Sequence, residues 1–285
     1  MSLTLLSVAP PAQYLSAMVQ LAKQQPPLGW EASVRISPQG VSPWRYLVGF
    51  AHNGAPTSFI ESFLAEQAMP RVFQEAFAAC LPWTSSVLFS VAPARAETEL
   101  RVYQEYVADV ATDIAMRGFK WSAGNLGAGA EGQERARMTD YRTVAAAMDD
   151  AEVVDYPQEL QAFLGVVLQW QKDTLDTAGA ASGPSLRMRS TEGQGARDAL
   201  SLRFTHTQKA LGSCRSDVRL LALSWGYSAS ALSQLDDLLR HVSDRLLNWV
   251  SVGLDTQGLP FISLYFTATE DDVLVAASHS HRRAA

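Results

Sequence analysis

Arginine recurs on the segments of this sequence that are predicted to be β-strands, and that choice of cation points to an anionic ligand. The positions are Arg35, Arg45, Arg101, Arg187 and Arg203, with Arg189 beside the fourth. Lysine is nearly absent from the same segments. A guanidinium presents a planar fork of donors that matches phosphate oxygens better than an ammonium does. The pattern favours a phosphate-like anion, and ordinary strands with a solvent-facing side are the alternative.

One carboxylate belongs to the same pattern. In the stretch from Gly29 to Ser37, the side chains of Glu31, Ser33 and Arg35 share a face, because side chains alternate along a strand. A carboxylate beside an anion site is a candidate general base. A plain salt bridge to Arg35 is the other interpretation of Glu31, and both stay open.

The elements that position these residues come as strand pairs separated by helices. Strands are expected at 30–37, 44–51, 85–92, 97–107, 185–190, 199–207, 218–227, 247–254 and 260–267. Helices are expected at 11–24, 108–118, 138–148, 157–176 and 229–244, with one more from Ser58 to Phe77 that Pro70 kinks or divides. The stretch from Gly124 to Gly132 is expected to be a loop, and the tail from about residue 268 a frayed terminus.

This order of elements predicts an α+β fold. Hairpins do not build a parallel sheet, so a doubly wound nucleotide-binding fold is excluded. No segment reads as a linker, which favours one domain over residues 1–285. Closure removes the exposed edges of a long sheet. We therefore expect a closed antiparallel β-barrel of about ten strands, with helices packed outside and polar faces lining the interior.

Composition limits the classes of function. The chain has 285 residues, of which 47% are hydrophobic and 18% are charged, and its net charge is -6. The acidic balance argues against a nucleic-acid partner, and no window reaches the ~18 apolar residues of a membrane-spanning helix. Cys80 and Cys214 lack metal-binding spacing and suit a reducing compartment. We read no signal peptide, and we expect a soluble, cytoplasmic monomer.

Several of these segments resemble a known family. Glu-Ala-Ser-Val-Arg-Ile at 31–36, followed by Arg-Tyr-Leu-Val-Gly-Phe at 45–50, is similar to the opening of the cyanobactin (ribosomal peptide) aromatic prenyltransferases, which belong to the wider ABBA prenyltransferase barrel. The resemblance continues in Glu-Leu-Arg-Val-Tyr at 99–103 and in the closing hairpin, 249–253 with 261–266. Ser263 departs from it, since the family tends to have a basic residue there, and 108–183 shows no detailed match.

The resemblance implies a transferase that moves a dimethylallyl or longer prenyl group, such as geranyl, from its diphosphate to an electron-rich side chain. The acceptor would be a Trp or Tyr of a peptide in ribosomal-peptide (RiPP) biosynthesis, or a small aromatic molecule. Mg²⁺ is a compatible companion of the diphosphate, and no metal site in the protein is implied. The implied general base is Glu31, the diphosphate ligands are Arg35, Arg45, Arg101, Tyr103, Arg187, Arg203 and Tyr265, and the prenyl and acceptor pocket contains Trp225 and Trp249.

A second class of function stays open beside the enzyme. A barrel of this kind without catalytic activity would bind a peptide or an anionic ligand as an accessory of a biosynthetic pathway. Prenyl transfer to any acceptor separates the two, because only the enzyme produces a covalently modified product.

Overall fold

The computed structural model describes residues 11–52, 57–93, 98–106, 114–123, 136–144, 156–178, 187–191, 198–204 and 208–284. These residues form two compact units. The β3–β7 unit contains the described parts of Val8–Ala32, Trp44–Arg142 and Ala268–Ala285, and the β8–β11 unit contains those of Ser33–Pro43 and Thr143–Thr267. Strand β1 begins in the first unit and ends in the second.

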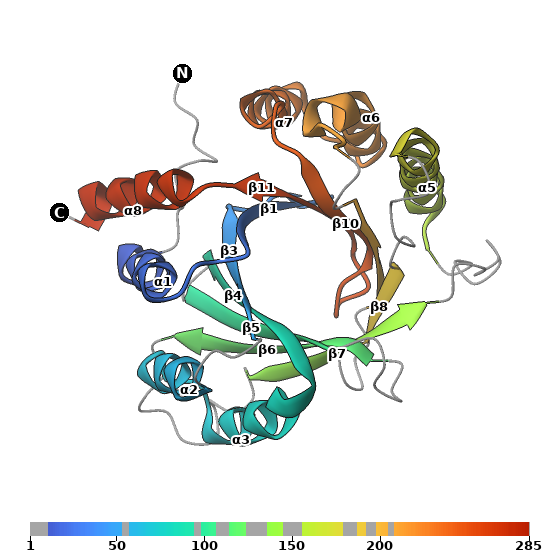
Figure 1. Cartoon of the computed structure of the whole chain (residues 1–285). Coiled ribbons are helices and arrows are strands. Elements are labelled where there is room, and N and C mark those ends of the chain that lie inside the picture. Colours follow the sequence, from blue (N-terminus) through green and yellow to red (C-terminus); the bar gives the residue numbers. More distant parts are fainter. Residues whose placement is uncertain are drawn as a thin grey trace. The chain divides into compact units, whose positions relative to one another are not determined.

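Strands and helices alternate along the chain in both units (Figure 1). The strands are β1 (Gly29–Ser37), β2 (Gly40–Val41), β3 (Arg45–Ala51), β4 (Thr84–Pro93), β5 (Thr98–Tyr106), β6 (Ile114–Ala123), β7 (Arg137–Val144), β8 (Arg187–Thr191), β9 (Asp198–Arg203), β10 (Leu247–Leu254) and β11 (Pro260–Ala268). The helices are α1 (Ala12–Gln24), α2 (Thr57–Glu66), α3 (Arg71–Cys80), α5 (Gln158–Ala178), α6 (Arg215–Ser224), α7 (Ala229–His241) and α8 (Glu270–Ala284), with short 3-10 turns η2 (Leu81–Trp83) and η4 (Leu211–Cys214).

The β3–β7 unit is an antiparallel meander in which each strand from β3 to β7 pairs with the next. Aromatic side chains join one face of this sheet to α2 and α3. The rings of Phe63 and Phe89 have centroids 4.8 Å apart, and Phe119 lies 5.6 Å from Phe73 and 6.0 Å from Phe77. The helices cover this face, and the side chains of Glu99, Arg101 and Lys120 alternate onto the other.

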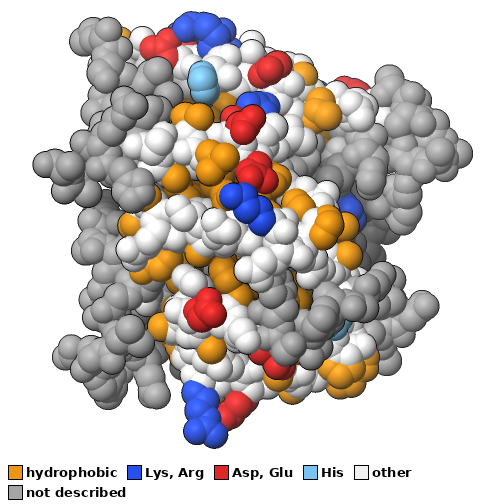
Figure 2. Space-filling model, turned by 60° about the vertical axis from the view of Figure 1, so that its left-hand side comes forward, with side chains coloured by type: hydrophobic (Ala, Val, Ile, Leu, Met, Phe, Trp, Pro, Cys, Tyr) orange, Lys and Arg blue, Asp and Glu red, His pale blue; other side chains and the backbone are white. Residues whose placement is uncertain are grey.

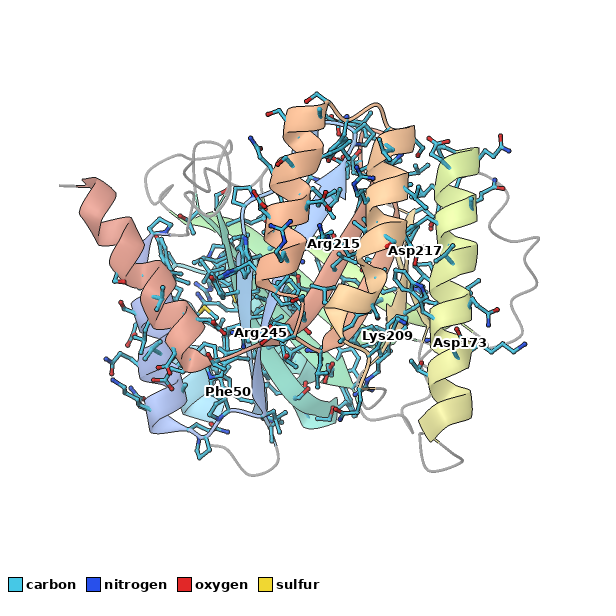
Figure 3. The ribbon with its side chains drawn as sticks, turned by 90° about the horizontal axis from the view of Figure 1, so that it is seen from above. Phe50, Asp173, Lys209, Arg215, Asp217 and Arg245 are labelled. Carbon is cyan, nitrogen blue, oxygen red and sulfur yellow. The ribbon has the colours of Figure 1, made fainter. Side chains whose placement is uncertain are left out.

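The β8–β11 unit repeats this plan. Strands β8 to β11 pair antiparallel in chain order, while β1 pairs with β2 and with β11. The row Leu202, Val250 and Leu264 is fully buried. Helices α5, α6 and α7 lie side by side over the unit (Figure 1 and Figure 3). The Nε1 of Trp170 on α5 donates to the carboxylate of Asp217 on α6 at 3.2 Å.

Two predicted helices are wrong. The prediction of a helix over 108–118 fails where β6 begins at Ile114, and the prediction over 138–148 fails at β7. In β6 the buried rings of Phe119 and Trp121 are two residues apart, which is the spacing of one face of a strand. Each strand gains its stability from a partner that lies elsewhere in the chain, and local helix preference does not report that pairing.

Two helices replace other predictions. Helix α6 occupies most of the stretch that was predicted as a strand over 218–227, since a short apolar run does not distinguish the two by itself. Helix α8 occupies the tail predicted to fray. Its buried residues Val273, Ala276 and Ala277 have helical spacing, and α8 packs on α1. The loop prediction at Gly124 lies outside the described residues.

The antiparallel α+β character is confirmed, and so is the division of a helix at Pro70, between α2 and α3. The single domain and the closure of the strands into a barrel stay predictions. Among the described residues, no helix has both the length and the apolar character needed to cross a membrane. On the face shown in Figure 2, acidic and basic side chains are interspersed with hydrophobic ones, and neither sign forms a patch.

The close approach of β9 and β10 at Gly253 makes a first prediction. A Cβ at Gly253 would lie 2.2 Å from the carbonyl oxygen of Asp198 and 2.5 Å from the Cα of Ala199, so Gly253→Ala forces two strands apart. We expect this substitution to lower the free energy of unfolding by ~1–3 kcal/mol, measured by urea denaturation.

Gly165→Ala in α5 is the matched control, because no heavy atom lies within 4 Å of a Cβ placed there. Alanine in a helix is favoured over glycine by up to ~1 kcal/mol, so this variant should be as stable as the parent or more so. Equal unfolding midpoints for the two variants would contradict the strand contact.

Candidate functional site

The polar face of the β3–β7 unit carries most of its ionisable side chains on two neighbouring strands. Glu99, Arg101 and Tyr103 alternate along β5 on the face turned away from the Phe119 side. The register of β6 pairs Arg101 with Lys120 and Tyr103 with Gly118. Two cations, one carboxylate and one phenol therefore lie close together on one face of the antiparallel strand pair β5 and β6.

Glu99 links the two cations of this cluster. The Nε of Arg101 donates to Glu99 Oε1 at 2.5 Å, and its Nη2 contacts the same oxygen. The Nζ of Lys120 lies 2.8 Å from Glu99 Oε2. The side chains of Arg101, Glu99 and Lys120 are only 16%, 17% and 29% exposed, so the three charges depend on one another for solvation.

The pKa values of the cluster follow from this pairing. Burial alone would raise the pKa of Glu99, but attraction to Arg101 and Lys120, together with their hydrogen bonds, lowers it to about 2. For Arg101, burial acts to lower the pKa, and the charge of Glu99 more than offsets it and raises the pKa above its usual value. Glu99 and Arg101 are thus both charged at neutral pH.

Two tyrosine rings lie beside the cluster. Arg101 Nη1 donates to the hydroxyl of Tyr103 at 3.4 Å, and the rings of Tyr103 and Tyr141 meet edge to face with centroids 6.1 Å apart. Gly118 leaves space for both rings, because a Cβ there would lie 2.9 Å from two ring carbons of Tyr103. The electron-rich faces of such rings attract cations.

Two more predicted site residues belong to this unit. Glu31 lies on β1 and Arg45 begins β3, and both side chains are half-buried. When the register of β3 and β4 is extended by one residue from Tyr46, Arg45 lies level with Ala92. Ala92 pairs with Glu99 on β5. Arg45 therefore occupies the same face as Arg101, two strands away.

The β8–β11 unit has its own polar face. Arg203, Trp249 and Tyr265 form one row across β9, β10 and β11. The guanidinium of Arg203 lies 5.5 Å from the centroid of the Trp249 ring, which is a cation–π distance. In the next row on this face, the hydroxyls of Ser201 and Ser251 are 2.7 Å apart.

Arg35 makes its contacts at the other end of this face. Its Nη2 donates to Asp255 Oδ2 at 2.9 Å, and its guanidinium carbon lies 4.0 Å from the centroid of the Phe261 ring. The turn of the β10–β11 hairpin holds Asp255 in place, since its Oδ1 accepts from the backbone N–H groups of Gln257 and Leu259. A carboxylate thus accompanies Arg35, as one accompanies Arg101.

The structure separates two predicted site residues from the rest. The register pairs Arg187 with Leu202, one position away from Arg203, which pairs with Trp249. Trp225 follows α6 as its C-cap and does not belong to a strand. Its Nε1 is buried and has no hydrogen-bond partner among the described residues.

Sequence reasoning missed Lys120 and Tyr141, and it did not assign Glu99 a role. Tyr141 lies on β7, in the stretch predicted as a helix over 138–148, and Lys120 lies on β6, just beyond the helix predicted over 108–118. The alternation of Phe119 and Trp121 around Lys120 was the signal that identifies a strand there. Among the residues that the structure describes, no group of three or more His, Cys, Asp or Glu side chains could hold a metal ion.

Comparison with known proteins supports the fold. No family model matches the chain, and no curated protein matches its sequence. Among solved structures, 5-dimethylallyltryptophan synthase from Streptomyces coelicolor is similar with a TM-score of 0.53 and 11% identity over 85% of this chain and 81% of that one. AnaPT from Neosartorya fischeri has a TM-score of 0.51 and 10% identity over 85% and 78%. The chain therefore shares the fold of these two proteins.

The lowered pKa of Glu99 makes a prediction about acid stability. A carboxyl group that ionises at about 2 in the folded chain and near 4.5 in the unfolded chain stabilises the fold above the second value, and loses that effect as the pH falls toward the first. We expect the stability advantage of the parent over Glu99→Gln to shrink between about pH 5 and pH 3, by at most ~1.4 kcal/mol per pH unit.

Urea unfolding of both proteins at a series of pH values measures this difference. Glu75→Gln is the control, because Glu75 pairs with Arg71 where both side chains are well exposed, and such pairs contribute little to stability. An advantage over Glu99→Gln that stays constant across the acid range would show that Glu99 is not held ionised by its partners.

Proposed function

We propose that this protein transfers a prenyl group from its diphosphate to an electron-rich aromatic acceptor, and that its strands close into one barrel around the site. The observation that carries the proposal is the cluster of Arg101, Lys120 and Tyr103 on one face of β5 and β6. The shared fold with 5-dimethylallyltryptophan synthase supports it. The cations lie on the face of the sheet opposite to the one that packs on α2 and α3.

The donor end of the reaction follows from the charges. Ionisation of an allylic diphosphate breaks the bond between C1 and oxygen, and the leaving group keeps the electron pair. Arg101 and Lys120 would neutralise the charge that develops on the diphosphate, and the hydroxyl of Tyr103 would donate a hydrogen bond to it. Arg45 lies on the same face, two strands away, and is the next cation that we assign to the diphosphate.

Transfer to the acceptor requires aromatic rings that stabilise the allylic cation and a base that takes a proton from the acceptor. The edge-to-face pair of Tyr103 and Tyr141 offers electron-rich surface to an allylic cation, worth roughly 0.5–2 kcal/mol per ring. Once the acceptor carbon or heteroatom has bonded to C1 of the prenyl group, the acceptor must lose a proton. Glu31 is the candidate to take that proton as a general base.

The β8–β11 unit supplies the remaining candidates. We assign Trp249 to the lining of the prenyl and acceptor pocket, and Arg203, Tyr265 and Arg35 to secondary contacts with the diphosphate. Arg187 and Trp225 receive no part, because the register and the helix end place them elsewhere. The donor is dimethylallyl or geranyl diphosphate, with Mg²⁺ as an optional companion, and the acceptor is a Trp- or Tyr-containing peptide, as in ribosomal-peptide pathways, or a small aromatic molecule.

Prenyl transfer is tested by incubating the protein with dimethylallyl diphosphate, with and without Mg²⁺, and a set of acceptors that includes tryptophan, tyrosine and short peptides containing them. Mass spectrometry should detect the gain of one C5H8 unit. Arg101→Gln should reduce kcat/KM by roughly 10²–10³-fold, since it removes a charge that stabilises the leaving diphosphate.

Arg71→Gln on α3 is the matched control, because Arg71 is 90% exposed and should leave the rate unchanged. Pyrophosphate binding without a prenylated product from any acceptor would favour the accessory protein that binds an anionic ligand. Loss of activity in both arginine variants would show that the effect is not specific to the cluster.

The role of Glu31 is a separate prediction. If Glu31 accepts the proton of the acceptor, Glu31→Gln should lower kcat by roughly 10²–10⁴-fold while the KM of the donor stays near that of the parent. Steady-state kinetics with the acceptor that gives the fastest rate make the measurement. An unchanged kcat would remove Glu31 from the mechanism and leave it as a structural partner of its neighbours.

A further inference from the structure

The carboxylate of Glu99 occupies the cations that the proposed function assigns to the donor. Its Oε1 accepts from Arg101 and its Oε2 lies 2.8 Å from Lys120, so both oxygens are engaged. The three side chains are 16–29% exposed, and the strand pair fixes their backbone positions. Two positive charges and one negative charge leave the cluster with a single positive charge.

A diphosphate that approaches Arg101 and Lys120 would need the donors that Glu99 already holds. If Glu99 stayed in place, its charge would lie next to the phosphate oxygens and repel them. If it turned away, the diphosphate would replace it as the partner of both cations. Either way the affinity for the anion is reduced by the presence of Glu99.

We propose that Glu99 is a built-in counter-anion of the donor site, which positions Arg101 and Lys120 in the free protein and is displaced from them by the incoming diphosphate. This inference rests on the proposed function of the cluster. Its consequence is selectivity by charge. An anion with few charged oxygens, such as inorganic phosphate, competes poorly with the tethered carboxylate, whereas a diphosphate brings enough charge and enough acceptor oxygens to replace it.

Glu99 therefore acts through Arg101 and Lys120 and is a positioning residue. Unlike a structural ion pair, it should lower the affinity of the site for anions while it holds the two cations in place. A purely structural partner has the opposite signature, because its removal would disorder the cations and weaken binding.

The test measures the Kd of inorganic pyrophosphate and of inorganic phosphate by isothermal titration calorimetry for the parent and Glu99→Gln. Glutamine keeps an acceptor oxygen for Arg101 and removes the charge. Because like charges in contact cost several kcal/mol and 1.4 kcal/mol is tenfold, we expect pyrophosphate to bind at least about tenfold more tightly to the variant. The gain should diminish at high salt. Phosphate should also gain, so that the preference for pyrophosphate falls.

Glu105→Gln is the matched control, since Glu105 lies on the same face of β5, beyond Tyr103, and accepts from the hydroxyl of Ser86. Glu105→Gln removes one negative charge at a position outside the cluster. The Kd values of pyrophosphate and phosphate should therefore stay near those of the parent. In turnover, Glu99→Gln should lower the KM of the prenyl diphosphate without a matching rise of kcat.

Unchanged or weaker pyrophosphate binding by Glu99→Gln would overturn the inference. If this variant does not fold, Glu99→Asp replaces it, because the shorter side chain keeps the charge but reaches the cations less well. Tighter binding than in the parent supports the inference, and equal or weaker binding overturns it. Arg101→Gln tests the proposed function separately. If this variant still binds pyrophosphate, the cluster is not the binding site of the prenyl diphosphate.

Discussion

The burial of one face of every strand is the constraint on which the rest of the structure depends. In the β3–β7 unit the aromatic contacts of Phe89 with α2 and of Phe119 with α3 bury that face of the sheet. Arg117 and Asp140 form an ion pair on the face that the helices cover, whereas Arg101 and Lys120 alternate onto the opposite face. Arg101 and Lys120 meet there because the register allows no other place for them. The polar face is thus a consequence of the apolar one.

The alternation also decides how much the sequence could predict. Where a strand is paired with its neighbour in the chain, as in the hairpin that includes Trp249 and Tyr265, the period of two is visible locally and the prediction is confirmed. β6 and β7 were missed because residues 107–113 and 124–136 separate them from β5 and from each other, so no short turn in the sequence marks their pairing. Val273 and Ala276 show the converse, a helical spacing overlooked in a polar tail.

For the site, the sequence predicted neighbours along a strand better than neighbours across strands. Arg101 and Tyr103 are two residues apart, so their shared face follows from periodicity alone, and the structure shows the contact between them. Lys120 belongs to the cluster through pairing of β5 with β6, which no local pattern specifies. Arg187 also depends on register, because β8 pairs it with Leu202 and not with Arg203, and periodicity within β8 does not specify that pairing.

The partly buried cations also decide what kind of binding the site can perform. An isolated guanidinium with 16% exposure is costly to keep charged, so the free protein needs an anion beside Arg101 before any ligand arrives. Glu99 provides it, and Asp255 does the same for Arg35. The binding of an anion at either place is therefore an exchange of one partner for another. The free energy of desolvating the cation is already included in the free energy of folding. The binding free energy of the ligand is therefore only the difference between its own contacts with the cation and those of the carboxylate. In such a site, selectivity depends on how many charged oxygens a ligand brings, because a ligand equivalent to one carboxylate gains nothing over the residue that it displaces.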